Sequence, residues 1–267
     1  MKICVCVKQV PASNETRLDP VTHTIIREGA EAILNPFDAF AVEEAVRLKA
    51  RFGGTITALT MGIPAAEAML RRVIAVGADE AVLLTDRAFA GSDTIATART
   101  LSRAVMKAGP FDLILCGRMA PDGDTAQVGP MLAENLGIPH VSDVAAIEAI
   151  ENGYITLRRL TDDGYVRVKA PLPALVTVLK EINIPRLPSI CGIFHGEAAT
   201  VTVYDRESLG IDADETGLRG SATRVVKTTR PDLTVKAEAI EGTPAQQTER
   251  LIERLRANHL IGEEARS

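Results

Sequence analysis

The stretch that decides the fold is DLILC, residues 112–116, followed at once by GRMAPDGDTAQVGP, residues 117–130. The short apolar run predicts a buried strand, and a helical pattern follows over about residues 125–136. In open α/β sheets, ligands bind beyond the carboxyl ends of the strands, where a loop in this position lies. The stretch therefore predicts a strand, a candidate ligand-binding loop and a helix.

The same alternation extends toward the N-terminus. Further strand-like runs cover residues 2–8, 55–61 and 80–85, and helical patterns cover residues 39–51, 65–76 and 93–108. Nearly continuous apolar strands separated by amphipathic helices are typical of a parallel sheet that is covered on both faces. The predicted fold class is α/β, with a doubly wound parallel nucleotide-binding sheet and right-handed crossovers.

The pattern changes after about residue 145. Runs at 154–160 and 165–168 flank Asp163-Gly164, which predicts a hairpin, and residues 173–179 predict another buried strand. Residues 183–199 combine prolines and glycines with Ile190, Ile193 and Phe194, and are expected to form an extended segment with weak local structure. A single amphipathic helix is predicted at about residues 244–260. We expect a domain over residues 1–215, including 183–199, and a C-terminal arm and helix over 216–267.

Composition excludes several classes of protein. The net charge is −5 and no basic patch is interleaved with aromatic residues, so nucleic acid is not an expected ligand. No stretch approaches the roughly 20 apolar residues that cross a bilayer, so no membrane insertion is expected. The four cysteines have no metal-like pairing and the four histidines are scattered, so we expect no metal and a cytoplasmic, reducing location. Cys4 and Cys6 share one face of a strand and are expected to be buried, inert thiols.

The loop after residue 116 has the residue types of a phosphate-binding turn. Gly117 and Gly123 allow close approach of a ligand, and Asp124 or Thr125 is expected to cap the next helix with Gln127 as a capping-box partner. Exposed amides at such a helix start suit a pyrophosphate, and the carboxylates suit ribose or ribityl hydroxyls. These residues alone are explained equally well by an ordinary, well-capped loop between a strand and a helix. The lack of a G-x-G-x-x-G motif after the first strand argues against a common NAD dehydrogenase domain, and QVPAS (9–13) argues against an ATP-cleaving ligase.

A series of motifs, in order, resembles the electron transfer flavoprotein beta subunits and covers residues 1 to about 215. They are VCVKQVP (5–11), NPFD (35–38), AVEEAVRLK (41–49), TMG (60–62), AVGADE (75–80), TDRAFAGSDT (85–94), the loop 117–130, PALVT (173–177) and SLG (208–210). In that family the positions matching the first strand end, the 35–38 turn, residue 61 and the loop surround a nucleotide, and those matching Thr94 and Thr97 line a flavin. The resemblance thus implies cofactor contacts at Cys6, Asn35, Pro36, Phe37, Asp38, Met61, Thr94, Thr97, Gly117, Arg118, Ala120, Asp122, Gly123, Asp124, Thr125, Ala126, Gln127, Val128 and Gly129.

The loop also distinguishes two kinds of family member. Members with a second FAD have the sequence DGDTAQVGP, as residues 122–130 do here, whereas members that hold structural AMP tend to have an acidic residue in place of Gly123. A carboxylate there would repel a diphosphate. The resemblance implies bound FAD, with AMP as the alternative, and NADH as a hydride donor whose electrons are divided between ferredoxin or flavodoxin and a second FAD.

The resemblance also implies partners. It predicts a heterodimer with an alpha subunit that carries the other FAD, and a client flavin dehydrogenase that docks on residues 185–196 with Ile190 as the anchor. No catalytic side chain is expected, because the cofactor carries the reaction. Three other hypotheses remain: a single-flavin carrier that holds AMP and serves acyl-CoA-type dehydrogenases, an ATP-binding module with the same core, and a structural subunit without cofactor.

Overall fold

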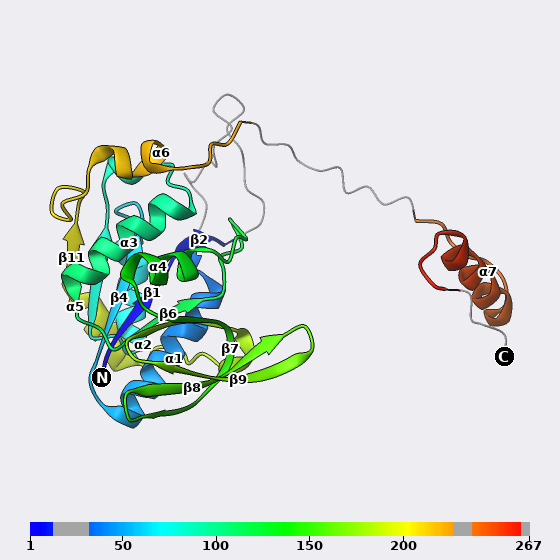
Figure 1. Ribbon diagram of the computed structural model, residues 1–267, viewed down its shortest axis with the longest axis horizontal. Coiled ribbons are helices and arrows are strands. Elements are labelled where there is room, and N and C mark those ends of the chain that lie inside the picture. Colours follow the sequence, from blue (N-terminus) through cyan, green and yellow to red (C-terminus); the bar gives the residue numbers. More distant parts are fainter. Residues whose placement is uncertain (13–31, 227–236, 263–267) are drawn as a thin grey trace. The chain divides into compact units, whose positions relative to one another are not determined.

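The computed structural model describes residues 1–12, 32–226 and 237–262 (Figure 1). The chain divides into two units, residues 1–226 and residues 227–267. The first unit holds the sheet and the helices around it, and the described part of the second holds one helix. Each unit is described by itself.

The first unit is built on a nine-stranded sheet with the order β11-β5-β4-β1-β6-β10-β7-β8-β9. Neighbours from β11 to β7 are parallel, and β8 and β9 extend the sheet with antiparallel pairs. The strands are β1 (Lys2–Cys6), β4 (Thr55–Met61), β5 (Glu80–Leu84), β6 (Leu113–Gly117), β7 (His140–Glu151), β8 (Tyr154–Thr161), β9 (Gly164–Pro171), β10 (Ala174–Val178) and β11 (Val201–Tyr204). A separate antiparallel pair joins β2 (Gln9–Pro11) to β3 (Ala32–Leu34).

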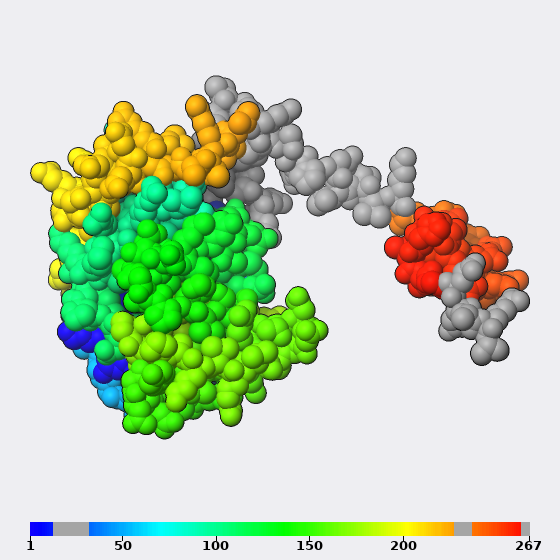
Figure 2. Space-filling model, viewed as in Figure 1, coloured from blue at the N-terminus to red at the C-terminus, as the bar shows by residue number. Residues whose placement is uncertain are grey.

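Helices cover both faces of this sheet. The elements are α1 (Pro36–Phe52), α2 (Ala66–Val76), α3 (Thr94–Ala108), α4 (Val128–Leu136), α5 (Ile190–Ala198) and α6 (Gly217–Gly220), with 3-10 turns η1 (Arg87–Phe89), η2 (Lys180–Ile182) and η3 (Ala213–Glu215). Alternate residues of β1 enter different cores: Ile3 and Val5 pack with α1 and α2, whereas Cys4 and Cys6 pack with α3 and α4. This follows from the two-residue period of a strand. In Figure 2 the unit is closely packed, with the tip of the β8–β9 hairpin projecting from it.

The parallel α/β class predicted from the sequence is confirmed, and the hairpin of β8 and β9 lies where the Asp-Gly turn predicted it. The short β2–β3 pair was not predicted, and two strands of the nine-stranded sheet were also missed. The strand β7 is long and irregular, with register shifts against both of its neighbours, which blurs its alternation. The short edge strand β11 follows the helix α5 and has a half-exposed pattern that resembles a loop.

The expectation that residues 183–199 are extended was wrong for their second half, which forms α5. Ser189 caps this helix, because its Oγ accepts a hydrogen bond from the backbone N of Gly192 at 3.0 Å. A Cβ at Gly192 would lie 2.2 Å from the carbonyl oxygen of Ala75, and one at Gly196 would lie 2.3 Å from that of Arg71. The two glycines therefore allow α5 to pack closely on α2 and do not loosen the segment.

The compact unit continues to Val226, past the expected boundary at residue 215. Thr216 is buried, and Thr223 donates hydrogen bonds from its backbone N and its Oγ1 to Asp93 Oδ2. Because Asp93 is also the N-cap of α3, residues 216–223 are fastened to the start of that helix.

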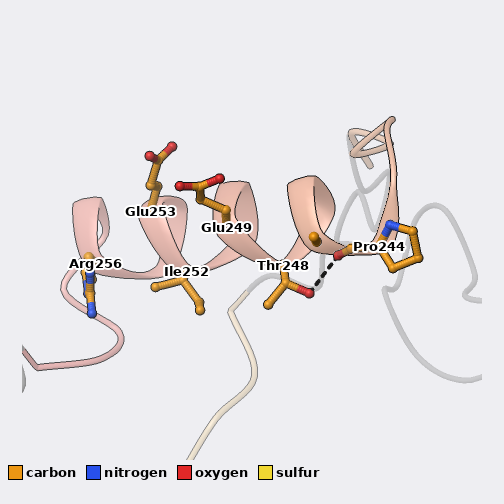
Figure 3. Close-up of a pocket in the computed structure, with 7 residues that line it drawn as sticks. Pro244, Thr248, Glu249, Ile252, Glu253 and Arg256 are labelled. Carbon is orange, nitrogen blue, oxygen red and sulfur yellow. Dashed lines mark hydrogen bonds between the residues drawn. The ribbon is translucent and has the colours of Figure 1, made fainter.

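The second unit contains α7 (Pro244–Ala257), which begins with a capping box between Thr243 and Gln246. An open hollow on this helix is lined by Pro244, Ala245, Thr248, Glu249, Ile252, Glu253 and Arg256 (Figure 3). No residue of α7 is buried within the described part of the chain. Among the described helices, none has both the length and the apolar character needed to cross a membrane.

Candidate functional site

The order of the strands reverses between β1 and β6, and the carboxyl edge of the sheet at this point is called the crevice below. From β1 the chain passes through α1 to β4 and through α2 to β5, and then returns through α3 to β6 on the other side of β1. Segments leaving β1 and β6 therefore diverge at the carboxyl edge of the sheet, which is where ligands bind in such sheets. Cys6 and Cys116 are paired neighbours at this point, and Met61 ends the adjacent strand β4.

Two buried side chains at the start of α1 join the segments that leave β1 and β6. The backbone N groups of Lys8 and Gly117 donate to Asp38 Oδ2 at 2.7 Å and Oδ1 at 3.1 Å. Asn35 donates from its backbone N to the carbonyl of Lys8 and from Nδ2 to the carbonyl of Met119, both at 2.8 Å. Burial raises the pKa of Asp38 to about 7, although the hydrogen bonds it accepts favour the carboxylate.

The segment after β6 also contacts other elements of the site. Lys8 Nζ forms an ion pair with Asp122 Oδ1 at 2.7 Å, and Thr94 Oγ1 at the start of α3 donates to Gln127 Oε1 at 3.0 Å. On the other side, Arg118 Nε lies 3.0 Å from Asp143 Oδ1. These contacts place a lysine, an arginine and the beginnings of two helices around one loop.

The expected capping of α4 by Asp124 or Thr125 was wrong. The helix begins at Val128, so Pro130 lies in its first turn, where a proline is tolerated. The N-cap residue is Gln127, whose side chain caps nothing because it accepts the hydrogen bond from Thr94. Asp124 and Ala126 have φ angles of 48° and 53°, so the loop turns through left-handed conformations before the helix.

The uncapped start of α4 leaves backbone donors available. In the described parts of the chain, no residue accepts a hydrogen bond from the backbone N–H groups of residues 125 to 129. Residues 125 to 127 are exposed, so their donors are open to solvent, whereas Val128 is partly buried and Gly129 is buried. A helix N-terminus with free amides binds anions such as phosphate. The loop therefore fits the diphosphate of a nucleotide cofactor.

The three glycines of this region have different roles. A Cβ at Gly117 would lie 2.4 Å from Asp38 Oδ1, and one at Gly129 would lie 2.6 Å from Thr177 Cγ2. Those two positions are needed for close packing inside the protein, which for Gly117 differs from the ligand approach expected from the sequence. At Gly123, by contrast, no heavy atom of the described residues other than its chain neighbours lies within 4 Å of the Cβ position, so the backbone there is open to a ligand.

The cysteines beneath the crevice are buried, as expected. Hydrogen bonding to Cys6, together with burial, raises the pKa of the Cys4 and Cys116 thiols well above the ordinary value. Hydrogen bonds from Cys116 and Cys4 lower the pKa of the Cys6 thiol instead. Protonated thiols are poor nucleophiles, so Cys4 and Cys116 serve packing.

The structure brings most of the predicted site residues to one edge of the sheet. These are Cys6, Asn35, Pro36, Phe37, Asp38, Met61, Thr94, Gly117, Arg118, Ala120, Asp122, Gly123, Asp124, Thr125, Ala126, Gln127, Val128 and Gly129. Thr97 lies one turn beyond Thr94 on α3 and is partly buried. Ile190 lies apart from them, at the start of α5, and is 75% exposed.

Sequence reasoning missed Lys8 and Asp143. Lys8 lies two residues after the carboxyl end of β1, so its position could have indicated a residue of the site. Asp143 could not have been found, because it comes to Arg118 only through the parallel pairing of β10 with β7.

A doubly wound parallel sheet, with free helix-start amides at its crevice, defines an α/β protein of the nucleotide-binding class. Residues 22–208 match the family described as "Electron transfer flavoprotein domain". The chain is 47% identical to an electron transfer flavoprotein subunit beta of Thermoanaerobacterium thermosaccharolyticum, over 98% of this chain and 100% of the relative. The chain belongs to the electron transfer flavoprotein family, as a beta subunit that takes part in electron transfer.

Two further relatives have names of other kinds. Subunit CarD of the caffeyl-CoA reductase-Etf complex of Acetobacterium woodii is 43% identical, over 98% of this chain and 100% of the relative. Protein FixA of Azotobacter vinelandii is 45% identical, over 90% of this chain and 88% of the relative. The similarity therefore extends over nearly the whole chain, including the candidate site.

Proposed function

We propose that this chain binds FAD at the crevice between β1 and β6, as the beta subunit of a heterodimer with an alpha subunit that carries a second FAD. When bound, the FAD of this chain would accept a hydride from NADH and supply single electrons, one to ferredoxin or flavodoxin and one toward the other FAD. The observation that carries the proposal is that the exposed residues 125 to 127 have backbone N–H groups with no described acceptor, next to the open position at Gly123.

The charges of the loop are compatible with a diphosphate. The carboxylate of Asp122 is paired with Lys8, which offsets its charge in the crevice. Asp124 is exposed and its side chain has no described partner, so its oxygens can accept hydrogen bonds from ribose or ribityl hydroxyls. The open backbone at Gly123 admits a diphosphate at a position where a carboxylate would repel it.

The start of α3 would lie beside the isoalloxazine ring. Thr94 is fixed to the loop through its hydrogen bond to Gln127, and Thr97 follows one turn later on the same helix. Hydroxyl groups here can orient a polar ring edge without exchanging protons with it. The protein would supply position and electrostatics, and the cofactor the redox chemistry.

The relatives support the partners as well as the cofactor. The name of the Acetobacterium woodii relative places that protein in a complex with a reductase, and we extend such an assembly to this chain. The exposed side chains of α5 would contact the client flavin dehydrogenase, and α7 would contact the alpha subunit.

The test is the cofactor content of the purified heterodimer. After denaturation, the released nucleotides are separated and counted against protein concentration. Two FAD and no AMP per heterodimer support the proposal. One FAD and one AMP would instead make this chain the beta subunit of a single-flavin carrier, and bound ATP without flavin would indicate an ATP-binding module.

A further inference from the structure

We propose that Asn35 and Asp38, called the clasp below, are positioning residues. They hold residues 118–127 in the conformation that receives the nucleotide and make no contact with the nucleotide themselves. The proposal deepens the proposed function and rests on it, because it assigns work to two residues that the family resemblance places among the cofactor contacts.

The clasp has little capacity for a ligand. Asp38 is 5% exposed, and each of its carboxylate oxygens already accepts a backbone hydrogen bond, from Lys8 and from Gly117. Asn35 is 1% exposed; its Oδ1 accepts from the backbone N of Phe37 and its Nδ2 donates to the carbonyl of Met119. The polar groups of both side chains are turned into the protein.

The position of the clasp explains why it is needed. Strands β1 and β6 are paired as far as Cys6 and Cys116, and beyond that point the two segments diverge. The side chains of the clasp supply hydrogen bonds where the sheet no longer does. The Asp38 carboxylate accepts from the N–H groups of Lys8 and Gly117, and the Asn35 amide donates to the carbonyl of Met119. The backbone N of Asn35 also donates to the carbonyl of Lys8.

Gly117 provides an independent sign of the same role. A Cβ there would lie 2.4 Å from Asp38 Oδ1 and 2.6 Å from the carbonyl carbon of Phe37. A glycine is therefore required for the start of α1 to approach the end of β6 closely enough for the clasp to form. Gly117 is therefore needed for this internal contact and not for contact with the ligand.

The first experiment measures the clasp without nucleotide. In Asp38→Asn, one of the two backbone N–H groups faces an amide NH2 group, so one hydrogen bond is lost. Hydrogen–deuterium exchange of peptides covering residues 117–127, in the nucleotide-free heterodimer, should be faster in this variant than in the wild type. Unchanged exchange would overturn the proposal, whether or not the protein binds FAD.

The second experiment separates positioning from contact, with AMP as the probe. A carboxylate only accepts hydrogen bonds, and the neutral donors of AMP are its two ribose hydroxyls and its amino group. Dissociation constants are measured for AMP, 2′-deoxy-AMP, 3′-deoxy-AMP and purine riboside 5′-monophosphate, each of which lacks at most one donor. Asp38→Asn should weaken all four by the same factor, roughly tenfold.

The matched control is Glu44→Gln. Glu44 is also a buried acid on α1, with a hydrogen bond from Asn183, but it lies away from the loop. The Glu44→Gln variant should leave hydrogen–deuterium exchange at residues 117–127 and the affinity for AMP unchanged. A second variant, Asn35→Ser, keeps a capping hydroxyl for α1 but cannot reach Met119, and it should reproduce the uniform loss.

Three results would contradict either the role of the clasp or the proposed function. A loss that disappears with one analogue would show that Asp38 touches the missing group, and would overturn the proposal. An equal loss in Glu44→Gln would show a general effect on α1 and would also overturn it. If the wild type binds neither AMP nor FAD, the proposed function fails, while the exchange measurement still tests the clasp.

Discussion

Gly123 is the residue whose chemistry separates the two candidate cofactors. Its Cβ position is open and its backbone does not require a glycine conformation, so a side chain fits without strain. Replacing Gly123 with Asp adds a negative charge beside the expected diphosphate, at a cost of about 1–4 kcal/mol. We expect Asp at this position to abolish binding of the second FAD and NADH oxidation, with AMP retained, measured as cofactor content per heterodimer.

The control for this change is Gly123→Asn, which has the same shape without the charge. It should retain two FAD per heterodimer. If both variants lose FAD, the cause is steric; if both retain it, the diphosphate does not lie at Gly123.

The buried carboxyl of Asp38 predicts a pH dependence of stability. Its pKa is raised by burial to about 7 in the folded protein, from an ordinary value near 4 in the unfolded chain. A raised folded pKa contributes stability that is complete below about pH 4 and is lost as the pH rises through about 7. Between pH 5 and pH 8, the free energy of unfolding of the wild type should fall by roughly 3 kcal/mol more than that of Asp38→Asn.

Urea unfolding at pH 5, 6, 7 and 8 measures this difference. Subtracting the free energy of unfolding of Asp38→Asn from that of the wild type at each pH removes the contributions of other titrating groups. Parallel curves for the two proteins would show that Asp38 has the same pKa in both states.

Among the elements, α5 presents the clearest unpartnered surface. Ile190 and Phe194 are 75% and 67% exposed, on a helix that is held to α2 by close glycine contacts and by Arg71, which donates to the carbonyl of Glu197 at 2.5 Å. A large apolar surface on a firmly packed helix is typical of a docking site. Ile190→Ala should slow electron transfer to the client dehydrogenase, with flavin content unchanged.

The control is Met106→Ala, which removes a half-exposed apolar side chain from α3, on the opposite face of the sheet. It should leave the transfer rate unchanged. Loss of flavin in Ile190→Ala would place the residue in the structural core instead.

For the whole molecule, the second unit is the part that lacks a core. The apolar side chains of α7 are at most partly buried in the described chain, and Leu251 is 47% exposed. An amphipathic helix without a buried face gains little from folding alone. Deleting residues 240–267 should therefore separate this chain from its alpha subunit, measured by gel filtration at micromolar concentration.

A deletion of residues 263–267 alone serves as the control and should leave the heterodimer intact. A pair that stays together after the longer deletion would show that other surfaces hold the subunits.

Much of the fold followed from local patterns in the sequence. The strands that alternate with helices in the first half, and the hairpin, carry their own periodicity and turn residues, so they could be predicted within a few residues. The strand β4 was predicted with its observed bounds, Thr55–Met61. The helix α5 was not predicted, because its glycines oppose a helix locally and are explained only by their packing against α2.

The candidate site, too, has features that the sequence determined and features that only the structure showed. The sequence by itself determined the parallel sheet, the loop beyond β6 and the family motifs, since each is written in consecutive residues. Only the tertiary structure decided that Asp38 and Gly117 meet, that Lys8 pairs with Asp122, and that Thr94 binds the side chain of Gln127, which was expected to be a capping-box partner. The reason is physical: these contacts join residues far apart in the chain, and parallel strand pairing brings their ends to one edge.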